Sequence, residues 1–185
     1  MKKIVLVMTV AFILGASNLV KAEAMDTILL YIPNRIVDFA DVVSGTLGFG
    51  PAFGVEAQAT QWLALGGDVG PTAQMVKGIN RQYGFTKQSG WNASFLMVSS
   101  GQRERTDSIG SVKDYYYYSA GVPWPDKVPY DFYNGAKDFW AVGAQFKALI
   151  DVEIYLHPVE IVDAVLGIFF IDIKGDDFTA DDIKE

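Results

Sequence analysis

Residues 47–60 read LGFGPAFGVEAQAT, in which the odd-numbered positions are mostly apolar and the even-numbered positions are small or polar. Side chains of a β-strand point alternately to its two faces, so this period of two predicts a strand with one apolar and one polar face. The pattern holds for about 14 residues, whereas a typical strand has about five or six. Pro51 cannot donate a hydrogen bond to a neighbouring strand and therefore indicates an edge, a bulge or a break.

A second long alternation covers residues 140–156, where the even-numbered positions are apolar. One long strand and two strands joined near Ala148 are both compatible with it, although no Gly or Asn marks a turn there. Between the two long alternations, shorter strands are expected at residues 62–70, 73–84, 91–99 and 112–119, and loops at residues 102–111 and 121–136.

Helical spacing of apolar residues appears at both ends of this β region, at residues 33–43 and 159–171. Pro33 and Pro158 begin the same six-residue pattern, proline followed by two residues and then Ile-Val-Asp. The sequence therefore predicts a mainly β fold: an antiparallel β-barrel-like or strongly curved sheet of about six to eight strands, with short amphipathic helices at both ends.

The first 22 residues have the features of an export signal. Lys2 and Lys3 precede an apolar run over residues 4–15, and small residues suitable for cleavage follow it. The apolar run has about a dozen residues, fewer than the about 20 that a membrane-spanning helix needs. We therefore expect a signal peptide at residues 1–22, a single β-rich envelope domain at residues 23–173 and a solvated acidic tail at residues 174–185.

Composition excludes several classes of function. The chain has 185 residues, a net charge of -7, one His and no Cys, which excludes disulfides, thiolate metal sites and sites with several imidazole ligands. The acidic balance argues against binding nucleic acid, which requires a basic surface. The sequence predicts no cofactor and no metal site.

Motifs for catalysis are also weak in the sequence. Gly48-x-Gly50-x-x-x-Gly54 has its third glycine one position too late for a dinucleotide-binding turn. The acidic segment from Asp172 lacks the glycine and glutamate of a calcium-binding EF-hand loop. His157 could act as a general base, but no Gly-x-Ser-x-Gly motif accompanies it, and a structural role is the simpler interpretation. We therefore expect a protein that is not an enzyme.

Several charged and amide side chains lie on the non-apolar faces of the expected strands. In a small barrel they would point into the lumen and pair with one another, Lys147 most obviously with an acid. In an ordinary antiparallel sheet they would coat a solvated outer face instead. The residues of this polar face are Glu56, Gln58, Asp68, Gln145, Lys147, Asp151 and Glu153.

Aromatic residues concentrate in one part of the chain, between residues 115 and 140. Tyr and Trp favour a boundary between an apolar and a wet environment, as at a membrane interface, a sugar-stacking surface or the edge of a core. The candidate interface aromatics are Tyr115, Tyr116, Tyr117, Tyr118, Trp124, Tyr130 and Trp140.

The signal peptide, the long strands with one small or polar face and the aromatic clustering together resemble small Gram-negative outer-membrane β-barrel proteins. The resemblance covers residues 45–157, and it implies a structural, adhesive, channel or lipid-handling role in the envelope. The chain departs from the usual pattern because it ends in a helix and an acidic tail rather than in a strand with a terminal Phe.

Three function classes follow. The first is a non-enzymatic cell-envelope protein associated with the outer membrane or its periplasmic face, with membrane lipid or envelope components as its partners. The second is a soluble periplasmic β-barrel or sandwich that binds an apolar ligand. The third, an exported hydrolase, would depend on an acid pair such as Asp151 and Glu153. The oligomeric state is not encoded in any pattern that we recognise.

The export signal makes a direct prediction about the mature chain. Signal peptidase cleaves after small residues, which stand at Ala22 and Ala24. We expect intact-mass spectrometry of the envelope form to find Glu23 or Met25 at the N-terminus. An envelope form that retains residues 1–22 would contradict this prediction.

Overall fold

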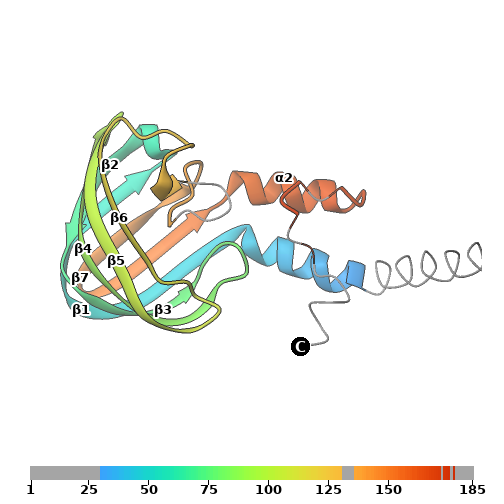
Figure 1. The fold of residues 1–185 in the computed structure, drawn as a ribbon, viewed down its shortest axis with the longest axis horizontal. Coiled ribbons are helices and arrows are strands. Elements are labelled where there is room, and N and C mark those ends of the chain that lie inside the picture. Colours follow the sequence, from blue (N-terminus) through green and yellow to red (C-terminus); the bar gives the residue numbers. More distant parts are fainter. Residues whose placement is uncertain (1–29, 131–135, 172, 176, 178–185) are drawn as a thin grey trace, which may run out of the picture.

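The computed structural model describes residues 30–130, 136–171, 173–175 and 177. It contains seven antiparallel strands in one sheet and two helices, one at each end, so the predicted fold class is confirmed (Figure 1). The N-terminal helix is described over residues 30–41, and α2 spans Pro158–Gly167. The strands are β1 (Val43–Gln58), β2 (Ala64–Val69), β3 (Thr72–Lys77), β4 (Tyr83–Leu96), β5 (Val98–Gly110), β6 (Tyr115–Gly121) and β7 (Val142–Leu156). Two short 3-10 helices, η1 (Gln61–Leu63) and η2 (Val128–Tyr130), lie in the connections.

The sheet is built around the ribbon of β1 and β7, which pair along most of their length. On its other side β1 pairs first with β3 and then with β2, and both of these short strands also pair with β4. β2 and β3 therefore lie end to end, separated by Gly70 and Pro71. β5 and β6 complete the sheet beyond β4.

The ribbon of β1 and β7 bends back on itself near its middle. Its register shifts between Phe49 and Phe53, a stretch that contains Pro51, as expected for a proline that interrupts a strand. Leu149 adopts a positive φ of 68° in the same region of β7, which is one bent strand rather than two. As a result Gly143 and Tyr155 meet: a Cβ built on Gly143 would lie 2.7 Å from the Tyr155 Cα.

The bend brings both ends of the ribbon to one side of the molecule, where the two helices are attached (Figure 1). On that side His157 at the end of β7 and Gln61 after β1 both contact the segment of residues 138–139. Side chains from opposite ends of the long strands can therefore share one cavity.

The polarity of the sheet is inverted relative to a water-soluble protein. Outward-facing apolar side chains of the strands are between 39% exposed, at Trp91, and 72% exposed, at Phe49. Most inward-facing side chains are polar or charged, and those that are buried are at most 8% exposed. The outer set includes Leu47, Phe49, Phe53, Val55, Leu65, Val69, Met75, Phe85, Trp91, Phe95, Ile109, Val142, Phe146, Ile150 and Ile154. The inner set includes Thr46, Glu56, Gln58, Asp68, Gln74, Gln88, Asn92, Ser94, Arg103, Gln145, Lys147 and Asp151.

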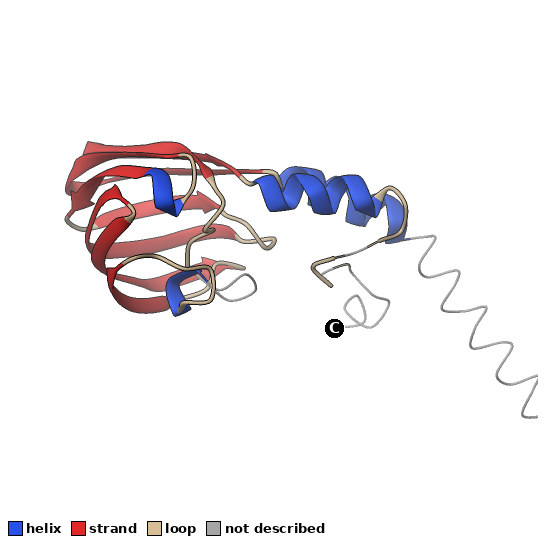
Figure 2. Cartoon of the chain, turned by 90° about the horizontal axis from the view of Figure 1, so that it is seen from above, coloured by secondary structure: helices blue, strands red, loops and turns tan. Residues whose placement is uncertain are grey.

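The two helices lie side by side (Figures 1 and 2). Their buried and exposed side chains repeat this inversion. The guanidinium of Arg35 packs over Gly167 of α2 and pairs with Asp38 at 2.8 Å. Burial raises the pKa of Asp38 to about 6, against the opposing effect of Arg35. Charged residues thus face the helix contact, while apolar residues are exposed, namely Ile32, Ile36, Phe39, Ile161, Val162, Val165 and Ile168.

Several predicted boundaries are wrong. The N-terminal helix occupies residues 30–41 rather than 33–43, and α2 ends at Gly167 rather than at residue 171. The strand expected at residues 73–84 ends at Lys77, because a turn with left-handed residues at Asn80 and Arg81 intervenes.

The largest error concerns residues 102–111: the sequence predicts a loop there, whereas residues 102–110 belong to β5. Their charges suggested solvent, whereas Arg103 faces the interior and pairs with Asp68 there. The predicted signal peptide lies outside the described residues. Of the predicted acidic tail, Lys174, Gly175 and Asp177 are described, and Lys174 and Asp177 each form an ion pair with a helix residue.

No helix in the described part of the chain is long and apolar enough to cross a membrane.

Neighbouring strands approach each other closely at several glycine residues, which allows the sheet to curve. The effect of a side chain at such a position can be tested at Gly66. Its φ is 123°, and a Cβ there would lie 2.0 Å from the Val55 carbonyl oxygen. The Gly66→Ala change should therefore lower the free energy of unfolding by about 2–4 kcal/mol, through strain and overpacking. Urea denaturation followed by tryptophan fluorescence measures this change.

Gly45→Ala is the matched control in the same sheet. A Cβ at Gly45 meets only the Glu153 carbonyl oxygen, at 3.8 Å. The control should leave the urea midpoint nearly unchanged. Equal midpoints for the two variants would contradict the role of Gly66 in the curvature.

Candidate functional site

A carboxylate on β2 organises the interior of the sheet. The Asp68 Oδ1 atom accepts hydrogen bonds from Arg103 Nη2 at 2.5 Å and from Gln145 Nε2 at 2.7 Å. Lys147 Nζ lies 3.4 Å from Asp68 Oδ2. Arg103 is on β5, and Gln145 and Lys147 are on β7, so these contacts cross the interior rather than link neighbouring strands.

Lys147 extends this cluster along β7. Its ammonium lies 3.2 Å from Asp151 Oδ2 and 2.9 Å from Glu153 Oε1, and it donates to Gln88 Oε1 at 3.1 Å. In a straight strand the side chains of residues 147 and 153 would be about 20 Å apart, so the bend in β7 brings them together. Arg103 Nη1 also donates to Gln88 Oε1, at 2.9 Å.

A second buried carboxylate, Glu56 on β1, faces β4. Its Oε2 atom accepts hydrogen bonds from the Asn92 amide and from the Ser94 hydroxyl, the latter at 3.1 Å. Lys137, from the segment before β7, donates to Asn92 Oδ1 at 3.2 Å. Gln58 lies farther along β1, where it donates to the Ala141 carbonyl at 3.1 Å.

All seven residues predicted on the polar face point inward, as the lumen alternative requires. Sequence reasoning missed Arg103, which lies at the centre of the cluster. The signal was present in the alternation of residues 99–105, where every second position faces inward. The seven residues are Glu56, Gln58, Asp68, Gln145, Lys147, Asp151 and Glu153.

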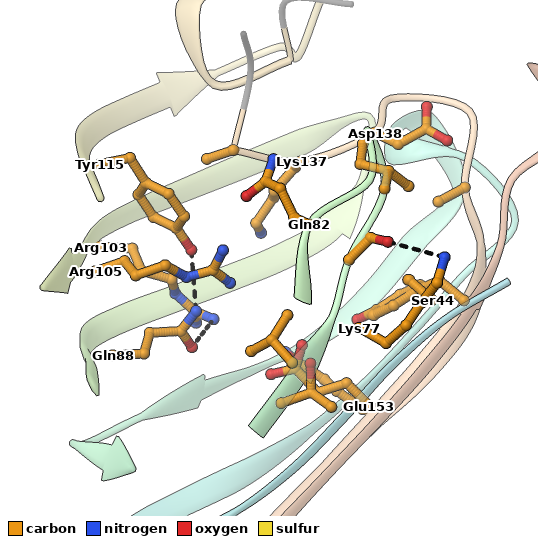
Figure 3. Close-up of a pocket in the computed structure, with 18 of the residues that line it drawn as sticks. Ser44, Lys77, Gln82, Gln88, Arg103, Arg105, Tyr115, Lys137, Asp138 and Glu153 are labelled. Carbon is orange, nitrogen blue, oxygen red and sulfur yellow. Dashed lines mark hydrogen bonds between the residues drawn. The ribbon is translucent and has the colours of Figure 1, made fainter. Parts of the chain in front are cut away.

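A cavity of about 240 Å³ lies within the bend, beside this cluster. Arg103, Arg105 and Tyr115 line one side of it, and Glu153 lies on the other (Figure 3). The Arg105 guanidinium stacks 4.7 Å above the Tyr115 ring, and the buried Nε of Arg105 has no hydrogen-bond partner. Lys113 also lines the cavity, whose lining includes five cationic side chains and four carboxylates.

A line of three side chains lies at the rim of the same cavity. The Ser44 Oγ atom is 2.8 Å from His157 Nε2, and His157 Nδ1 is 2.7 Å from Asp138 Oδ2. Ser44 is near the start of β1, His157 follows β7, and Asp138 belongs to the segment before β7. The sequence analysis identifies His157 as a possible general base, but no sequence pattern indicates its two partners. They are 113 and 19 residues away in the chain.

The predicted interface aromatics divide into two groups. Tyr116, Tyr118, Trp124 and Trp140 are exposed on the outer surface, which an interface position requires. Tyr117 and Tyr130 are buried, and Tyr115 faces the cavity.

Among the described residues, no group of three or more His, Asp and Glu side chains is placed to hold a metal ion. The chain matches no protein-family model, no curated protein and no solved structure.

The pairing of Arg103 with Asp68 can be tested by Arg103→Met. Removing one partner of a buried ion pair leaves the other charge poorly compensated, which costs about 3–5 kcal/mol. We expect the free energy of unfolding to fall by about that amount in urea denaturation.

Lys87→Met is the control, because Lys87 forms an exposed ion pair with Asp107, with side chains 69% and 64% exposed. Its urea midpoint should stay at the wild-type value. A midpoint for Arg103→Met within error of this control would contradict the structural importance of the inner cluster.

Proposed function

We propose that this chain is a bacterial cell-envelope protein, associated with the outer membrane, that handles a lipid or a small molecule in its polar cavity. The observation that carries the proposal is the inverted polarity of the sheet. Exposed apolar side chains make up most of the outer face, where Gln102, Glu104 and the ion pair of Lys87 with Asp107 are also exposed, while many charged side chains are buried inside. Water penalises such an outer surface, whereas hydrocarbon favours it.

The backbone also supports a position in lipid. An unpaired backbone group costs several kcal/mol in hydrocarbon. Within the described residues, strands β1 to β5 are paired on both sides, whereas β6 pairs only with β5 and β7 only with β1, so lipid can cover the faces of the sheet but not these two edges. β1 has 16 residues and β7 has 15, whereas about 9–11 residues suffice for a tilted strand to cross a bilayer.

The helices support a position at the membrane surface. Their exposed faces are apolar, and charged residues face the contact between the helices, as Arg35 does where it packs over Gly167 of α2. A helix with an unpartnered apolar face can lie in the boundary between headgroups and acyl chains. The exposed Trp124 and Trp140 suit the same depth.

The alternative, a soluble periplasmic protein with an apolar ligand, has less support. A site for an apolar ligand is mostly lined by apolar side chains. This cavity is lined by Arg103, Arg105, Lys137 and Glu153, which favour a polar or charged group.

Single cysteines provide the test, because the chain has no native Cys. Phe53→Cys and Val142→Cys place a thiol on the apolar outer face. In native membranes a polarity-sensitive dye at either position should report a lipid environment. Gln58→Cys and Gln145→Cys, on the inner face, should react slowly with a bulky maleimide until the protein is denatured.

Asp126→Cys is the matched control, since this exposed residue lies in the turn between β6 and η2, outside the strands, and should report water. A water-like signal at both Phe53 and Val142 in native membranes would refute the membrane association. Extraction of the wild-type protein by alkaline carbonate would refute integral insertion.

A further inference from the structure

We propose that Ser44, His157 and Asp138 form a hydrolytic site for acyl esters that carry an anionic group. This inference goes beyond the proposed function. All three residues belong to this chain, so the site does not depend on whether the protein lies in a membrane. It would also replace the expectation, drawn from the sequence, that the protein is not an enzyme.

The geometry assigns a role to each nitrogen of His157. A carboxylate only accepts hydrogen bonds, so Nδ1 carries the proton and donates it to Asp138 Oδ2 at 2.7 Å. Nε2 of the neutral imidazole is then the acceptor for the Ser44 hydroxyl at 2.8 Å. These distances and roles are those of a nucleophile, a general base and a residue that orients the base.

The backbone and neighbouring groups hold this line in place. The His157 amide donates to the Val42 carbonyl at 2.9 Å, which ties the end of β7 to the start of β1. The second oxygen of Asp138 accepts the Trp140 amide at 2.9 Å. His157 is buried, whereas Ser44 is only half-buried and lines the cavity. The nucleophile therefore faces a space that a substrate can enter.

The proposed reaction needs only an ester and water. Ser44 Oγ attacks the carbonyl carbon while His157 Nε2 takes the hydroxyl proton; the ester C–O bond then breaks, and the imidazolium returns the proton to the leaving alcohol. Water attacks the acyl-serine by the same route, which releases the carboxylic acid and restores Ser44.

The cavity indicates the substrate class. Arg105 has no carboxylate within ion-pairing distance among the described residues, and its buried Nε lacks a hydrogen-bond partner. Lys113 and Lys137 line the same space. The Lys137 ammonium, which also donates to Asn92, adds a further positive charge to this space. An ester with a carboxylate or phosphate near the reacting carbonyl complements these groups.

A fluorophosphonate probe tests the nucleophile directly. Purified full-length protein in detergent should form one covalent adduct, located at Ser44 by peptide mass spectrometry and absent in Ser44→Ala. Ser99→Ala is the matched control, because Ser99 is a buried serine of the same sheet that hydrogen-bonds to the Tyr130 hydroxyl instead of a histidine. It should be labelled like the wild type.

Two further variants separate catalysis from a purely structural hydrogen-bond chain. His157→Gln keeps a polar side chain at this position but provides no base, and should lower the labelling rate at least about 100-fold. Asp138 is a positioning residue, so Asp138→Asn should lower the rate while changing its dependence on pH. Circular dichroism verifies that each variant is folded.

Hydrolysis of soluble esters and of lipid vesicles then distinguishes the source of the ester. A soluble aryl hemisuccinate should be hydrolysed at least about 10-fold faster than the neutral aryl butyrate, and fatty acid release from phosphatidylglycerol vesicles would place the ester in a lipid. Equal rates for the two aryl esters would overturn the anionic preference. The absence of an adduct on folded wild-type protein, or unchanged labelling in His157→Gln, would overturn the hydrolytic site.

Discussion

The interior carboxylate of Asp68 is the constraint on which the fold depends. A charged group inside a protein loses its hydration, at a cost of several kcal/mol, and must recover that free energy from charged or hydrogen-bonding partners. Its partners Arg103 and Lys147 belong to β5 and β7, which do not adjoin β2 in the sheet. These contacts exist only if the sheet curves far enough for its strands to face one another, so charge pairing and curvature require each other.

The bend in the long ribbon connects this constraint to the candidate site. Pro51 lies in the register shift of β1, and Leu149 has a positive φ in the paired region of β7. The ribbon therefore folds over and brings its two ends together. The same bend that places Glu153 beside Lys147 also places Asp138 beside His157. A straight ribbon would separate each of these pairs and leave no shared cavity.

Much of the fold could be predicted, because the alternation of apolar and polar residues identifies the two faces of a strand. It does so whether the apolar or the polar face is the one exposed to water. The long strands and the inward set from Glu56 to Glu153 follow from that pattern. The loop predicted at residues 102–111 is wrong because charged residues indicate a position in water only in an ordinary sheet. In this inverted sheet Arg103 is charged and buried. Ser44 and Asp138 could not be found, because their proximity to His157 results from the bend and from a segment without periodic structure.

The position of the two helices affects how a ligand would reach the cavity. They are attached on the side where the strand ends meet, which is also where Ser44 and His157 lie (Figure 1). If lipid covers the apolar outside of the sheet, their exposed apolar faces hold this side at the headgroup boundary. An amphiphile there keeps its acyl chain in hydrocarbon while its anionic group is drawn toward Arg105 and Lys113. The ester bond between the two parts would then lie at the rim, within reach of the Ser44 hydroxyl.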